Sequence, residues 1–61
     1  MPDYMVVFVD DENQTHANFF ERYDNAYCAA QDAAVSLGWY VELYERDHNP
    51  LDPQYRLLAV M

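Results

Sequence analysis

The sequence has no lysine, one cysteine and one glycine, and none of its apolar runs approaches the ~20 residues of a membrane span. The single Cys28 excludes a disulfide within one chain, and one thiol cannot hold a structural zinc ion. It fits a reducing compartment and a small, apolar position on a helix. With Gly38 alone, the chain has no glycine-rich loop to cradle phosphate. No basic segment follows Met1, so we expect no signal peptide and a soluble protein in the cytoplasm of a microbe or an infected host cell.

Positively charged residues are also scarce. Three arginines face eleven acidic residues, which gives a net charge of -8. Direct binding to nucleic acid requires clustered basic side chains, so the composition argues against it, and an anionic membrane surface is disfavoured for the same reason. The acidic excess instead favours a basic protein partner or electrostatic steering toward one.

The length of 61 residues allows a single domain covering 1–61. A chain this short buries only about 60% of the surface that its unfolded form exposes, so its stability margin is thin. Apolar residues make up 52% of the chain, which is enough to drive collapse and argues against disorder.

Hydrophobic patterning divides the chain into four elements. Tyr4–Val9 is a continuous apolar run of strand length, and it ends at a polar segment. From Thr15 to Leu37 the apolar residues recur at offsets of three and four, which predicts a helix that ends at Gly38. Trp39–Arg46 and Gln54–Met61 read as two further strands, joined by a segment with two prolines.

This order predicts a small α+β (or small α/β) fold, a single β-α-β-β domain. We expect a three-stranded mixed sheet with the helix packed on one face. The helix would act as a right-handed crossover between parallel first and second strands, and the third strand would return antiparallel beside the second. The order is then 1-3-2, which places the apolar third strand in the centre, or 1-2-3. The sequence favours the former.

One helix can cover only one face of such a sheet, so the other face is a candidate binding surface. If Arg46 lies opposite Gln54, then Leu43 faces Leu57 under the helix. The uncovered face would combine tyrosine and arginine, which are enriched at binding hot spots, with apolar side chains. The predicted partner-binding residues are Tyr40, Glu42, Tyr44, Arg56 and Leu58.

Acidic residues follow the first two strands, and the carboxyl ends of parallel strands meet at one edge of a sheet. The expected acidic edge comprises Asp10, Asp11, Glu12, Asp47 and Asp52, with His16 and His48 nearby. Carboxylates and imidazole suit a divalent metal or an acid–base pair. The spacing matches no metal motif and no nucleophile accompanies the acids, so we predict no metal, no cofactor and no enzyme.

The leading hypothesis is a small acidic protein-binding module that occupies the surface of a basic partner. Its short, acidic character resembles that of small phage or mobile-element proteins that inhibit host defence or nucleic-acid machinery. One such target is a basic groove that binds nucleic acid, which the protein would block as a nucleic-acid mimic. The charge of a dimer approaches that of about 30 Å of duplex DNA. The alternatives are a structural homodimer without a ligand and a small metal-dependent or acid–base enzyme at the acidic edge.

Overall fold

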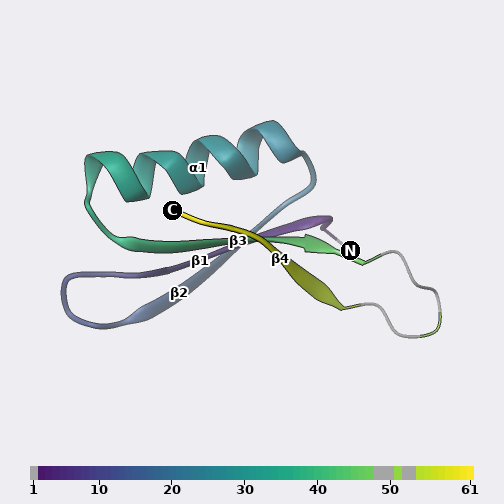
Figure 1. Cartoon of the computed structure of the whole chain (residues 1–61), viewed down its shortest axis with the longest axis horizontal. Coiled ribbons are helices and arrows are strands. Elements are labelled where there is room, and N and C mark those ends of the chain that lie inside the picture. The colour runs from purple at the N-terminus through teal and green to yellow at the C-terminus, as the bar shows by residue number, and fades with distance from the viewer. Residues whose placement is uncertain (1, 48–50, 52–53) are drawn as a thin grey trace.

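The computed structural model describes residues 2–47, 51 and 54–61 and contains one helix and four strands (Figure 1). In chain order the elements are β1 (Tyr4–Val9), β2 (Thr15–Phe20), α1 (Tyr23–Ser36), β3 (Tyr40–Arg46) and β4 (Tyr55–Val60). The strands form one sheet, and α1 lies along one face of it. The α+β class and the single covering helix are as predicted, whereas the three-stranded mixed sheet is not.

The sheet order is β2-β1-β3-β4, and each neighbouring pair is antiparallel. The three predicted strands therefore follow the order 1-2-3, with the last strand at an edge, and the favoured 1-3-2 order is wrong. The crossover through α1 joins β2 to β3, which run in the same direction with β1 between them. β1 and β3 are consequently antiparallel, because the β1–β2 hairpin reverses the chain before the helix begins.

The predicted helix from Thr15 to Leu37 is wrong over its first turns, where the chain forms β2. The reversal is made by a turn in which the Asp10 N–H donates to the Gln14 carbonyl and the Asn13 N–H to the Asp10 carbonyl. Asn13 has φ 62°, a left-handed conformation that asparagine tolerates better than most residues. The turn sets Phe8 opposite His16 and Val9 opposite Thr15. The resulting strand contains Thr15, Phe19 and Phe20, and β-branched and aromatic residues favour strands.

Helix α1 packs on the sheet through alanines. Ala26, Ala30 and Ala33 are buried at spacings of four and three, and their small side chains allow a close approach to the strands. Beyond the helix Gly38 adopts φ 69°, as the sequence predicts, and the Trp39 N–H donates to the Ala33 carbonyl.

The core under the helix is small. Besides the three alanines it contains Val6, Val41 and Leu43, and no buried residue among those described is polar. Seven partly buried side chains pack around this cluster: Tyr4, Phe8, Phe20, Ala34, Trp39, Ala59 and Met61. Such a core supports only a modest free energy of unfolding, about 3–5 kcal/mol at most for a domain of this size.

Within the described residues, α1 is too short and too polar to cross a membrane.

Candidate functional site

The sheet face opposite α1 is uncovered in the described part of the chain (Figure 1). Alternation along the strands assigns its side chains, because Val6, Val41 and Leu43 point to the helix and their neighbours point away. We call this surface the open face. Its members are Met5, Val7, Val9, Thr15, Ala17, Phe19, Tyr40, Glu42, Tyr44, Arg46, Tyr55, Leu57 and Val60.

The open face is largely apolar and contains large side chains that water reaches. The exposed fractions are 53% for Phe19, 46% for Tyr40, 48% for Leu57 and 57% for Val60. They come from β2, β3 and β4, and the half-buried side chains of β1 lie between β2 and β3. At one end the rings of Phe19 on β2 and Tyr55 on β4 lie 6.0 Å apart, so side chains of the two edge strands meet across the open face.

Three predicted binding residues, Tyr40, Glu42 and Tyr44, form a hydrogen-bonded triad on this face. The Tyr40 hydroxyl donates to Oε2 of Glu42 at 2.7 Å, and the Tyr44 hydroxyl donates to Oε1 at 2.9 Å. The pKa of Glu42 lies below its ordinary value, first because of the Tyr40 hydrogen bond and then because of that from Tyr44. The pKa of each tyrosine is raised in turn, chiefly by its hydrogen bond to Glu42.

The structure separates the other two predicted binding residues from this triad. The β3–β4 ladder pairs Leu43 with Ala59 but Tyr44 with Leu57, so Leu58 is an extra residue at a β-bulge. Arg56 therefore lies opposite Glu45, which shares the helix-side face with Leu43, and donates to its carboxylate at 3.4 Å. The expected Leu43–Leu57 and Arg46–Gln54 pairings are wrong. Leu43 lies opposite Ala59, and Arg46 lies opposite Tyr55.

One end of the open face is held by contacts with the N-terminal segment. Arg46 forms an ion pair with Asp3, with Nη2 and Oδ1 3.0 Å apart, and its backbone N–H donates to the Asp3 carbonyl. The Tyr55 hydroxyl donates to the Pro2 carbonyl at 2.8 Å. These contacts tie β3, β4 and the segment before β1 together, so the Arg46 guanidinium is engaged within the chain.

The predicted acidic edge does not exist as one site. Because β1 and β3 are antiparallel, Asp10, Asp11 and Glu12 follow β1 at one end of the sheet, while Asp47 follows β3 at the other. His48 and Asp52 lie outside the described residues. The prediction failed because it assumed parallel strands, whose carboxyl ends share an edge.

The acids after β1 instead support a turn with an aromatic cluster. Oδ1 of Asp10 accepts the N–H groups of Glu12 and Gln14, and Oδ2 lies 2.7 Å from Nε2 of His16. The pKa of Asp10 is lowered, first by the His16 hydrogen bond and then by that from Gln14. The His16 ring stacks on Phe8 with centroids 5.1 Å apart.

Trp39 completes the cluster and joins it to the second acid of the turn. Its ring stacks on Phe8 at 5.3 Å, and its Nε1 donates to Oδ1 of Asp11 at 3.2 Å. Both carboxylates therefore have structural hydrogen-bond partners. No three potential ligands among residues 2–47, 51 and 54–61 are arranged to hold a metal ion.

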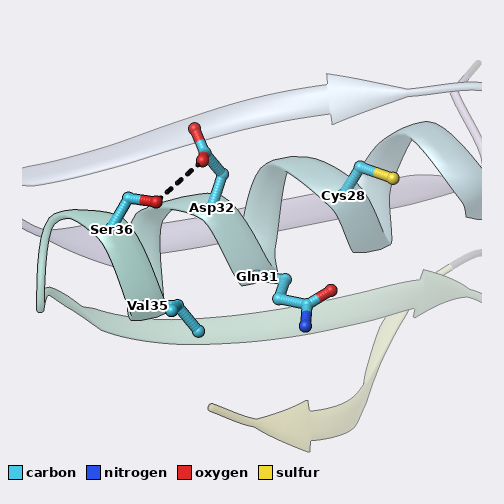
Figure 2. A pocket seen from close by; sticks show the side chains of 5 residues that line it. All are labelled: Cys28, Gln31, Asp32, Val35 and Ser36. Carbon is cyan, nitrogen blue, oxygen red and sulfur yellow. Dashed lines mark hydrogen bonds between the residues drawn. The ribbon is translucent and has the colours of Figure 1, made fainter.

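A shallow hollow also lies on the outer surface of α1, and Figure 2 shows the five side chains that line it. All come from the helix itself: Cys28, Gln31, Asp32, Val35 and Ser36. Ser36 donates to Asp32 at 3.1 Å. Cys28 is exposed here, although free cysteines are usually buried. The hollow is open, and the one polar contact that its side chains make among the described residues is internal to the helix, so the open face is the stronger candidate.

Comparisons with protein-family models, with curated proteins and with solved structures find no match to this chain.

Proposed function

We propose that this protein is a small acidic module that acts by binding another protein through the open face. The observation that carries the proposal is the exposure of Phe19, Tyr40, Leu57 and Val60 on one uncovered surface. A largely apolar exposed surface of this kind is unfavourable in water and marks interaction sites on folded proteins. Tyrosine and phenylalanine supply large contact areas at small cost in side-chain entropy.

The charge of the module supports a basic partner. The chain carries a net charge of -8, yet the open face has only Glu42 and Arg46 as charged side chains. Asp10, Asp11 and Glu12 follow β1 at one end of the sheet and Asp47 follows β3 at the other. The overall negative charge steers a basic protein during approach and adds less once contact is made. An inhibitor that occupies a basic nucleic-acid groove is the version of this function that we favour, in the cytoplasm of a microbe or an infected cell.

The proposal is tested with two variants in which glutamate replaces an apolar residue, one on each side of the molecule. Leu57→Glu places a charge on the open face, and Val35→Glu places the same charge on the outer surface of α1, where Val35 is 75% exposed. The parent and each variant are immobilised and exposed to the same cell extract, and the proteins that they retain are compared by quantitative mass spectrometry. We expect a basic protein that the parent and Val35→Glu retain and Leu57→Glu loses. Equal retention by all three would overturn the proposal.

Self-association is the competing use of the same face. Light scattering at low and high salt measures the mass of the parent in solution. We expect a monomer, because two copies bring together net charges of -8 each. A dimer that Leu57→Glu dissociates and Val35→Glu preserves would assign the open face to a structural homodimer instead.

A further inference from the structure

Glu42 is a partly buried carboxylate that has no cationic partner among residues 2–47, 51 and 54–61. Both of its hydrogen bonds come from neutral tyrosine hydroxyls. The chain has three arginines and no lysine, and each arginine is engaged elsewhere: Arg22 with Asp24, Arg46 with Asp3 and Arg56 with Glu45. Within the described part of the chain, the charge on Glu42 is therefore stabilised by hydrogen bonds from neutral groups and by no ion pair.

The neighbours of Glu42 on the open face make this charge important for binding. Val7 lies opposite Glu42 on β1, and Val60 lies opposite it on β4. A partner that covers these two valines also removes water from the carboxylate. Burial of an unpaired carboxylate is strongly unfavourable, so a fitting occupant brings its own cation to this position.

We propose that the Tyr40–Glu42–Tyr44 triad is a receptor for one arginine side chain of the partner protein, an inference that rests on the proposed function. Each carboxylate oxygen has two lone pairs, and the tyrosines use one on each. The remaining two accept the parallel N–H groups of a guanidinium in a bidentate pair. The tyrosine hydroxyls fix the carboxylate in advance, so little side-chain entropy is lost on binding.

Arginine fits this site better than lysine. Successive residues on one face of a strand are about 7 Å apart, so Tyr40 and Tyr44 stand on either side of Glu42 along β3. A planar guanidinium stacks on such rings and is more weakly hydrated than an ammonium group. A second copy of this chain is a poor occupant, because the only arginine on its open face, Arg46, already pairs with Asp3.

The direct test uses a small probe of the arginine side chain, N-acetyl-arginine amide, and its neutral isostere N-acetyl-citrulline amide. Each is titrated at low salt into the isotope-labelled protein, and NMR shifts are followed at Tyr40, Glu42 and Tyr44. We expect saturable shifts centred on the triad with the arginine compound. Affinity for the citrulline compound should be about tenfold lower, because it loses a charge-assisted pair. Equal shifts with both compounds, no shifts, or shifts centred on Asp10 to Glu12 would overturn the proposal.

Matched variants separate this inference from the proposed function. Glu42→Gln removes the charge on the open face, and Glu45→Gln removes a charge three residues along the same strand on the other face. We expect Glu42→Gln to lose the arginine shifts and to weaken binding of the basic protein captured by the parent, with Glu45→Gln equal to the parent in both. If Leu57→Glu abolishes capture while Glu42→Gln binds as the parent does, the open face is the interface and the arginine receptor is wrong. If neither variant affects capture, both proposals fail.

Discussion

Leu43 and Leu57 lie on adjacent strands but on opposite faces of the sheet. Leu43 is 1% exposed under α1, whereas Leu57 is 48% exposed on the open face. The β-bulge at Leu58 produces this separation, because it shifts the pairing by one residue between Leu43 and Tyr44. One leucine therefore supports the core and the other is available for binding.

The same substitution at these two leucines should have different effects on stability. Leu43→Ala leaves a cavity in a core of six buried residues and should lower the free energy of unfolding by about 2–5 kcal/mol. This loss is comparable to the whole stability expected of such a small domain, so we expect a largely unfolded chain. Leu57→Ala should change stability by about 0.5 kcal/mol or less. Urea unfolding followed by Trp39 fluorescence and circular dichroism measures both, and similar losses at the two sites would contradict the assignment of faces.

Much of this architecture could be predicted from the sequence, and the exceptions have physical causes. Tyr4–Val9 and the strands after Gly38 were predictable because apolar, β-branched and aromatic residues are concentrated in them. β2 was missed because Phe20, Tyr23 and Tyr27 continue the helical spacing of α1. The cue for a hairpin was the Asp10–Gln14 segment, whose turn depends on the Asp10 side chain accepting two backbone N–H groups.

The candidate site was predictable in part for related reasons. Tyr40, Glu42 and Tyr44 alternate with Val41 and Leu43, so their common face follows from the period of a strand. β4 offers no such signal, because Leu57, Leu58, Ala59 and Val60 are all apolar and either register buries an apolar side chain. The bulge, and with it the positions of Leu57 and Arg56, became visible only in the folded sheet.

The triad predicts a shift in the ionisation of two of the six tyrosines. The hydrogen bonds to Glu42 raise the pKa of Tyr40 and Tyr44, so in NMR titration both should ionise above the ordinary value of about 10. Because the folded-state pKa is raised, this stabilisation is present below about pH 10 and is lost as the pH rises through the folded pKa. In Glu42→Gln both tyrosines should ionise at a lower pH than in the parent. Glu45→Gln is the control, and an equal shift there would argue against the hydrogen bonds as the cause.

The Asp10–His16 contact predicts sensitivity to acid. The pKa of Asp10 is lowered in the folded state, so its contribution to stability is present above the ordinary carboxyl pKa of about 3.9 and is lost as the pH falls through the folded value. Asp10→Asn should lower the melting temperature at pH 7 and flatten its dependence on pH below about 5. Thermal melts from neutral to acidic pH measure this. A parental pH profile for Asp10→Asn would contradict the proposed role of the turn.

Gly38 offers a test of backbone conformation that is independent of packing. It has φ 69°, and the Cβ of an L residue there would meet no atom of the described residues within 4 Å apart from its chain neighbours, so the cost of an L substitution comes from the backbone. L-alanine disfavours this left-handed conformation by about 1–2 kcal/mol, whereas D-alanine prefers it and also restricts the unfolded chain. A chain of 61 residues can be made by chemical synthesis, which permits both substitutions. Gly38→L-Ala should destabilise the domain by about 1 kcal/mol or more, and Gly38→D-Ala should stabilise it by about 0.4–1 kcal/mol. Urea unfolding of the three synthetic proteins decides the matter, because equal destabilisation by both alanines would mean that the space around Gly38, and not its φ angle, requires glycine.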